Sequence, residues 1–330
     1  MNDLLRRFVF GFLIAGVLVV LFGSGTHAES GQAFTISPPL VELNANPGQT
    51  VEATIKLTNV SAGTLSITTQ ANDFGSKNET GEPNIIFDDK EPPPYTLKGW
   101  VGVPDDFTLA SKETRTLTVP IAVPVTAEPG GHYGVIRFTG ASAADGQNDV
   151  ALSASIGTLV LLRVSGDIKQ DAKVEEFYSA ASDFSKQSFF EAGPVTLVGR
   201  IRNDGNIHVK PTGTITIKDM YGNVIKTLRM NGDPSSNTDQ PRSILPQSVR
   251  RFDTELKDLQ LFGNYTATMK LTYGDGKTLS SETTFWVVPV KMIVLVVAGL
   301  AIVGTLFVVG MKKYNAHIIK KAQDKSGTPK

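Results

Sequence analysis

The sequence predicts an all-β protein, in which two antiparallel, immunoglobulin-like β-sandwich domains lie between an N-terminal signal segment and one C-terminal transmembrane helix. Apolar and polar residues alternate repeatedly between residues 29 and 289, and this period of two is typical of strands with one buried face. Clusters of proline, glycine and asparagine separate the alternating runs, as chain reversals require. Long apolar stretches stand near both ends of the chain, in the order expected of a signal peptide and a membrane anchor.

The first 28 residues have the composition of a secretory signal peptide. Arg6 and Arg7 precede an apolar run over residues 8–22, and small residues follow up to Ala28. A basic region, a short apolar region and a small-residue cleavage site occur in this order in signal peptides. We therefore expect cleavage after Ala28 and export of the residues that follow.

The first sandwich domain is predicted over residues 29–167. Its alternating runs are Val51–Leu57, Leu65–Ala71 and Leu117–Val123. The segment Leu159–Val164 is apolar on both faces apart from Arg163, which predicts a central strand with both faces covered.

The second sandwich domain is predicted over residues 168–289, with the boundary between the domains in the segment Ser165–Lys173. Alternation recurs over Val195–Ile201 and Tyr265–Tyr273. Residues 214–228 are predicted to form a hairpin around a Tyr-Gly-Asn turn. The last strand, Thr278–Val288, runs almost directly into the membrane segment. Little linker remains, so this domain is expected close to the bilayer.

Residues 290–311 are predicted to cross the membrane as a single helix. The stretch Met292–Met311 contains no charged residue, and about 20 residues at about 1.5 Å each span the hydrocarbon core. The tail, residues 312–330, carries six lysines and one aspartate, and the positive-inside rule places such a tail in the cytoplasm. The predicted location is therefore the cell membrane, single-pass, with both sandwich domains outside.

The charge distribution and the absence of cysteine exclude several kinds of protein. The formal net charge is zero, but the N-terminal segment, Lys291 and the tail together carry seven net positive charges, which leaves about −7 on the exported part. An acidic exterior gives no electrostatic reason to bind nucleic acid. With no cysteine in the chain, the domains depend on core burial rather than on disulfides. Exported domains without disulfides are more typical of bacterial or archaeal surface proteins.

Short motifs follow one another along both domains in an order that is found elsewhere. They are Ile36–Leu43, Pro47–Thr50, Leu57–Ser61, Phe107–Leu109, Thr114–Pro124, Pro129–Ile136, Ile201–His208 and Phe262–Ala267. Together with the two terminal segments, this order resembles the WxL-interacting proteins of Gram-positive bacterial surfaces. The resemblance implies an immunoglobulin-like first domain associated with peptidoglycan and a second domain that binds a protein partner. It assigns no binding residue, because no compact motif maps onto single positions.

No pattern in the sequence predicts catalysis, a cofactor or a metal site. His27 falls in the signal segment and His317 in the tail, while His132 and His208 are predicted to be surface residues next to turns. None of the four belongs to a metal-binding pattern such as H-E-x-x-H. Adjacent acidic residues on a strand point to opposite faces, so they do not make an acid–base pair. We therefore expect a protein that is not an enzyme.

The candidate binding residues are three aromatic side chains of the first domain, Tyr95, Trp100 and Tyr133. Together they are of the type that stacks on a carbohydrate ring. The competing interpretation is that Trp100 fills the core of the first sandwich, as large aromatic residues do in such folds.

The function predicted from these features is binding or scaffolding at the cell surface. The expected partners are a cell-wall polymer such as peptidoglycan, another surface protein, or both. The alternative is a chaperone-like assembly protein that accepts a partner strand at a sheet edge, and it predicts a long uncovered edge in the first domain. An enzyme with a site assembled across the two domains is a third alternative.

Overall fold

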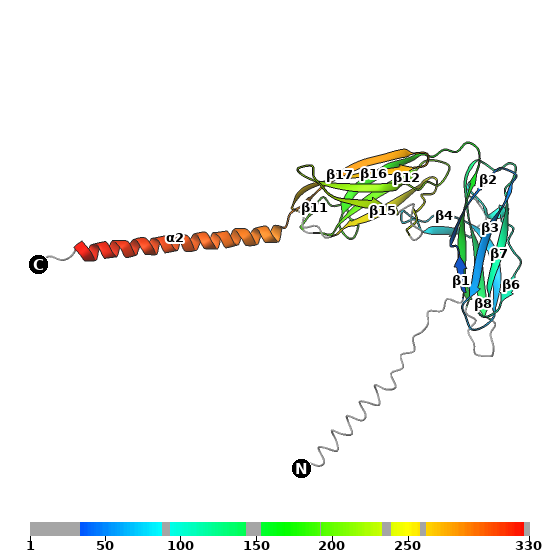
Figure 1. The fold of residues 1–330 in the computed structure, drawn as a ribbon, viewed down its shortest axis with the longest axis horizontal. Coiled ribbons are helices and arrows are strands. Elements are labelled where there is room, and N and C mark those ends of the chain that lie inside the picture. Colours follow the sequence, from blue (N-terminus) through cyan, green and yellow to red (C-terminus); the bar gives the residue numbers. More distant parts are fainter. Residues whose placement is uncertain are drawn as a thin grey trace, which may run out of the picture.

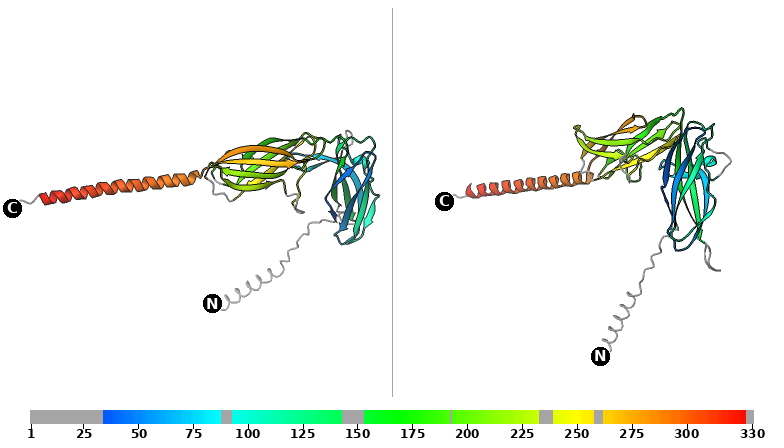
Figure 2. Two further views of the ribbon diagram at one scale, coloured as in Figure 1. Left: turned by 45° about the horizontal axis from the view of Figure 1, so that its top comes forward. Right: turned by 45° about the vertical axis from the view of Figure 1, so that its right-hand side comes forward.

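The computed structural model describes residues 34–87, 93–142, 153–191, 193–232, 239–257 and 262–326. The predicted signal segment, residues 1–28, lies outside the described residues. Figure 1 shows two β-sandwiches that meet at an angle, and one long helix that extends from the second of them. The views in Figure 2 show the same bend between the sandwiches.

The N-terminal sandwich contains nine strands in two sheets. They are β1 (Phe34–Ser37), β2 (Leu40–Ala45), β3 (Thr50–Asn59), β4 (Leu65–Ser76), β5 (Pro83–Ile86), β6 (Phe107–Leu109), β7 (Thr114–Ala122), β8 (Gly130–Ser142) and β9 (Ser153–Val164), with a short 3₁₀ helix, η1 (Lys98–Trp100), before β6. One sheet has the order β1-β3-β7 and the other has the order β2-β9-β8-β4-β5, with β6 also paired to β4.

The C-terminal sandwich contains eight strands in two sheets. They are β10 (Ala172–Ala180), β11 (Phe189–Phe190), β12 (Val195–Asn203), β13 (Thr212–Asp219), β14 (Val224–Met230), β15 (Ser248–Leu256), β16 (Gly263–Tyr273) and β17 (Lys277–Val287). The sheet orders are β10-β12-β15 and β11-β17-β16-β13-β14.

The alternation seen in the sequence accounts for both cores. In β3, Ile55 and Leu57 are fully buried while their neighbours Thr54 and Lys56 face solvent. Side chains from both sheets of the N-terminal sandwich form one apolar cluster, and those of the C-terminal sandwich form another. Each cluster removes apolar surface from water at about 25 cal/mol per Å², which is the main stabilisation open to a chain without cysteine. The prediction of an all-β sandwich fold is therefore confirmed.

The sheets are not purely antiparallel, contrary to the prediction. Strand β2 pairs in parallel with β9, and β11 pairs in parallel with β17. The first case follows from Pro38 and Pro39, which separate β1 from β2. Proline has no N–H to donate to a ladder, so pairing with β3 stops there and the chain continues as an edge strand of the opposite sheet.

Strand β9 has apolar neighbours on both faces, as its sequence predicts. Val160 and Leu162 point into the core of the N-terminal sandwich, while Leu161 belongs to a separate cluster with Phe74 and Tyr133. Leu245 of the C-terminal sandwich packs against this second cluster. Around Leu161, the outer face of the β9-containing sheet is therefore covered by the second sandwich rather than by water.

The helix α2 (Val290–Ser326) begins two residues after β17, which confirms that little linker remains. Its first turn is attached to the sandwich, because the Lys291 ammonium lies 3.3 Å from the Glu191 carboxylate and its backbone N–H donates to the same carboxylate. The helix is long and apolar enough to cross a membrane, and its apolar side chains are exposed along its length. Anchoring by one C-terminal helix is thus supported by the structure.

Candidate binding site

The candidate site is a cavity of about 440 Å³ on the N-terminal sandwich, here called the polar cavity. Its lining residues are Thr69, Gln70, Ala71 and Asn72 of β4, Arg137 of β8, and Phe87, Lys98 and Val103 from connecting segments. The cavity lies at an interruption in pairing along β4. Strand β6 pairs with Leu65–Ile67 and β5 with Asp73–Ser76, so within the described residues the stretch between them has no strand partner on that side.

Some residues that line this cavity carry polar atoms without a hydrogen-bond partner. In the described part of the chain six buried side-chain nitrogen or oxygen atoms lack a hydrogen bond, and three of them are Thr69 Oγ1, Asn72 Oδ1 and Arg137 Nε. Thr69 and Asn72 are each only 7% exposed. Thr69 is opposite Phe138 and faces the core, whereas Asn72 and Arg137 share the outer face of the sheet. A buried polar group without a partner costs about 1–3 kcal/mol, so Asn72 Oδ1 and Arg137 Nε indicate a place that a polar ligand completes.

An exposed aromatic ring borders these polar atoms. Phe87 is 65% exposed, and the guanidinium carbon of Arg137 lies 5.2 Å from its ring centroid. A second guanidinium nitrogen of Arg137 donates to Gln70 Oε1, and Asn72 Nδ2 donates to the Ile86 carbonyl at 3.3 Å. The arginine and asparagine are therefore held in place while each keeps an unpaired atom.

The three aromatic residues predicted from the sequence do not form one exposed surface. The Tyr95 and Tyr133 rings lie edge to face with their centroids 5.7 Å apart, but Tyr133 is fully buried. Trp100 is half-buried, packs against the N-terminal core and lies 4.3 Å from the His132 ring. Burial raises the pKa of both tyrosine hydroxyls. The structure thus brings Tyr95 and Tyr133 together and places Trp100 at the core.

Both histidines of the described sandwiches are less exposed than the sequence suggests. His132 is 4% exposed, and its ring nitrogens lie 3.0 Å from the carbonyl oxygens of Thr96 and Glu128. His208 is half-buried between the sandwiches, where its backbone N–H donates to the Tyr133 hydroxyl at 2.8 Å. The prediction of surface histidines is wrong, because packing of η1 and of the second sandwich covers the turns beside them.

The two sandwiches are joined by polar contacts as well as by the cluster around Tyr133. Arg200 of β12 pairs with Glu79 of the β4–β5 hairpin through two N–H···O contacts of 2.7 and 2.5 Å. The Arg251 backbone N–H donates to the Glu79 carbonyl at 2.7 Å. Gly131 N–H donates to the Asn206 carbonyl at 2.8 Å. Hydrogen bonding to Arg200 lowers the pKa of Glu79, so the pair is charged at neutral pH.

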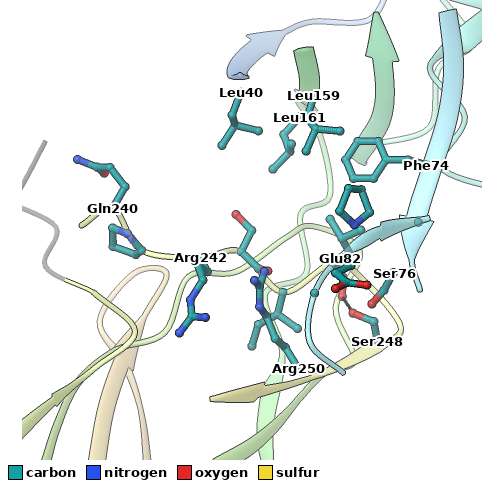
Figure 3. Close-up of a pocket in the computed structure, with 17 residues that line it drawn as sticks. Leu40, Phe74, Ser76, Glu82, Leu159, Leu161, Gln240, Arg242, Ser248 and Arg250 are labelled. Carbon is teal, nitrogen blue, oxygen red and sulfur yellow. Dashed lines mark hydrogen bonds between the residues drawn. The ribbon is translucent and has the colours of Figure 1, made fainter. Parts of the chain in front are cut away.

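A second cavity, of about 290 Å³, lies between the sandwiches and is here called the interface cavity. Figure 3 shows Leu40, Leu159 and Leu161 of the N-terminal sandwich on one side of it and Arg242 and Arg250 of the C-terminal sandwich on the other. Its walls are contributed by both sandwiches, so its shape depends on their relative position.

No group of three or more histidine, aspartate or glutamate side chains within the described residues is placed to hold a metal ion. The polar cavity was not found from the sequence. The available signal was the continuously buried run Ala71–Gly75, which includes the polar residues Asn72 and Asp73. That signal is visible only when burial is known, because the sequence of this strand does not show which of its polar residues are buried.

Comparison with known proteins leaves the family open. No protein-family model and no curated protein matches this chain. Among solved structures, the chain is similar to the YadV chaperone (11% identity, 77% of this chain and 100% of that chain, TM-score 0.37) and to the class 5 fimbriae chaperone CfaA (12%, 76% and 98%, 0.39). It is also similar to the E. coli chaperone DraB (14%, 77% and 96%, 0.33). At these identities and TM-scores the likeness transfers no function to this chain.

Proposed function

We propose that this chain is a membrane-anchored cell-surface protein that binds a cell-wall glycan polymer through the polar cavity of its N-terminal sandwich. The observation that carries the proposal is that Asn72 and Arg137, each with an unpartnered polar atom, line the same cavity as the exposed ring of Phe87. A few convergent polar groups next to an apolar or aromatic surface are the usual composition of a small-molecule or sugar site. Membership of the WxL-interacting protein family is part of the same proposal.

The chemistry of the cavity suits a ligand rich in hydroxyl and amide groups. Asn72 Oδ1 accepts and Arg137 Nε donates. The ring of Phe87 offers a flat apolar face beside them. A sugar with N-acetyl groups presents both kinds of partner, whereas a purely apolar ligand leaves the buried polar atoms unsatisfied.

The anchor is the second part of the proposal. The tail that follows the apolar part of α2 is rich in lysine, and the positive-inside rule orients it toward the cytoplasm. Both sandwiches then face outward, with the C-terminal one at the bilayer because only Val288 and Pro289 separate β17 from α2. The bend between the sandwiches directs the N-terminal one away from the axis of the helix (Figure 1).

Retention on purified peptidoglycan sacculi tests the proposal. The full chain in lipid nanodiscs is mixed with sacculi and sedimented, and empty nanodiscs give the background. We expect retention of the unaltered protein and a loss of about 5- to 10-fold in affinity for Phe87→Ala and for Arg137→Gln, which corresponds to about 1–1.4 kcal/mol. Tyr221→Ala removes an 83% exposed aromatic residue from the other sandwich and serves as the matched control.

Equal retention of all four proteins, or no retention of the unaltered one, contradicts the proposal. Phe87 is exposed, so its removal leaves the core intact, and a change in retention reports on binding rather than folding. Thermal unfolding of each variant confirms this.

A second candidate function is acceptance of a partner strand at β7. This strand forms the edge of its sheet. Gly102 pairs with its C-terminal end, where the Gly102 N–H donates to the Pro120 carbonyl at 2.8 Å. Between Thr114 and Val119 no described residue pairs with the outer edge. Such an edge is a template for strand addition.

Amide hydrogen exchange separates the two candidates. A cell-wall fraction that retains its surface proteins is added to the nanodisc protein. Strand addition slows exchange over residues 114–119, whereas glycan binding slows it over residues 68–72 and leaves β7 unchanged. The second candidate is abandoned if β7 exchanges at the same rate with and without the fraction.

A further inference from the structure

Arg250 is a half-buried cation, and one of its donors is unpaired. Arg250 lies on β15, and its Nη1 donates to the Ser243 carbonyl at 2.6 Å. Its Nε is buried and has no partner among the described residues. Arg250 lines the interface cavity together with Arg242.

The N-terminal sandwich closes over this cation. Gly81, in the β4–β5 hairpin, has φ of +78°, and a Cβ added there would lie 2.2 Å from the Arg250 guanidinium carbon. Only glycine allows the hairpin to approach so closely at this φ. The position of Arg250 is thus set by both sandwiches.

No carboxylate neutralises Arg250 in the described part of the chain, since none lies within 4.0 Å of it. Glu82 lines the same cavity but is paired with Lys77 at 3.9 Å. Burial, followed by the charge of Arg242, lowers the pKa of Arg250 to about 10, so the group remains a cation at neutral pH. The Phe252 ring, with its centroid 5.9 Å from the guanidinium carbon, offsets only part of this charge, so a bound counter-ion is favourable.

Besides polar residues such as Glu82 and Arg242, the cavity has an apolar part. Leu40, Leu159, Leu161 and Phe74 come from the N-terminal sandwich and Leu245 from the C-terminal one, all lining the space next to Arg250 (Figure 3). A ligand that fills the cavity therefore carries a nonpolar group within reach of its charged end. A single negative charge costs less to desolvate here than the double charge of a phosphate.

We propose that the interface cavity binds the carboxylate of an amphipathic ligand, with Arg250 pairing the carboxylate and the leucine side chains receiving the nonpolar part. A guanidinium matches a carboxylate with two parallel N–H···O bonds. The ligand bridges both sandwiches and stabilises their relative position. This site goes beyond the proposed glycan function and lies in a different cavity, so the two are tested by separate variants.

Calorimetric titration of the full chain in nanodiscs tests the inference, with empty nanodiscs as baseline. The probes are hexanoate and N-acetyl-leucyl-leucine with a free C-terminus, which represent a fatty acid and a peptide end. Each is compared with its neutral amide. We expect carboxylates to bind at least 10-fold more tightly than amides, and the stronger of the two acids identifies the source of the ligand.

Three variants complete the test. Arg250→Gln is expected to lose the preference for carboxylates, and Arg250→Lys to keep part of it, because lysine retains the charge but not the planar fork. Arg115→Gln removes an arginine of β7 that does not line the interface cavity. This control variant is expected to bind the probes like the unaltered protein. Without ligand, Arg250→Gln is expected to melt at the same or a higher temperature, since an unpaired cation is removed.

Two results overturn the inference. One is equal affinity for acids and amides, or unchanged binding by Arg250→Gln. The other is a large fall in melting temperature of ligand-free Arg250→Gln, which shows that the guanidinium is a structural element of the interface. Neither result bears on the glycan proposal, which is tested separately by retention on sacculi.

Discussion

Arg200 and Glu79 form a two-pronged ion pair across the boundary between the sandwiches, with N···O distances of 2.7 and 2.5 Å. Arg200 also reaches Glu176 of its own sandwich at 3.3 Å, so the same guanidinium is held from both sides. The β4–β5 hairpin that carries Glu79 is attached a second time, by the backbone bond from Arg251. This hairpin therefore couples the sandwich that bears the polar cavity to the sandwich attached to the membrane helix.

Arg200→Gln is expected to loosen the angle between the sandwiches while leaving each sandwich folded. The pair is partly exposed, so its loss costs about 1 kcal/mol, enough to increase the population of open arrangements several-fold. Distance distributions between spin labels on the two sandwiches measure this. Arg202→Gln breaks a similar two-pronged pair with Glu175 inside the C-terminal sandwich and is expected to leave the distribution narrow. Equal broadening in both variants contradicts the prediction.

Tyr133→Phe is expected to destabilise the interface by about 1–2 kcal/mol. The hydroxyl accepts the His208 backbone N–H at 2.8 Å and lies 3.2 Å from His208 Nδ1, and its loss leaves a buried donor without a partner. Chemical denaturation measures the change in the free energy of unfolding. Tyr221→Phe alters an exposed tyrosine and is expected to change it by less than about 0.5 kcal/mol.

Acidification is expected to weaken the interface through His208. Burial lowers the pKa of His208 from 6.5 to about 4, with Glu42 opposing the shift and Lys210 and Arg163 adding to it. The unfolded state therefore takes up a proton first as the pH falls. The stabilisation is fully present above pH 6.5 and is lost progressively between pH 6.5 and 4, by about 3 kcal/mol in total.

Denaturation curves at a series of pH values test this expectation. His208→Gln is expected to flatten the profile over that interval, whereas His317→Gln, on the exposed part of α2, is expected to retain it. The assignment to His208 fails if both variants lose stability as steeply as the unaltered chain. Loss of the Glu79–Arg200 pair occurs at lower pH, because the pKa of Glu79 is itself lowered by Arg200.

The membrane orientation can be read from single cysteines, since the natural chain has none. Tyr221→Cys places a thiol on the C-terminal sandwich and Lys321→Cys places one on the basic end of α2. A membrane-impermeant maleimide added to intact cells is expected to label the first and to spare the second until the membrane is permeabilised. The reverse pattern contradicts the proposed topology.

The part of the fold that could be predicted from the sequence is the part set by the local order of apolar and polar residues. The alternation in Val51–Leu57 and Tyr265–Tyr273 identified β3 and β16, and the apolar run Leu159–Val164 identified a central strand. Each depends only on which face of a strand meets water. Strands β2 and β11 could not be assigned to parallel partners in this way, because their partners lie more than 90 positions away in the chain.

The same distinction between local sequence and tertiary neighbours applies to the two cavities. The sequence by itself determined the strands, their inward faces and the apolar helix with its lysine-rich end, since these follow from side-chain hydrophobicity and local spacing. Only the tertiary structure decided that Tyr133 is buried between the sandwiches, that Asn72 and Arg137 line one cavity, and that no carboxylate of the described residues pairs with Arg250. The physical reason is that burial and electrostatic pairing depend on neighbours brought together by the sheets, and the order of residues along a strand does not specify them.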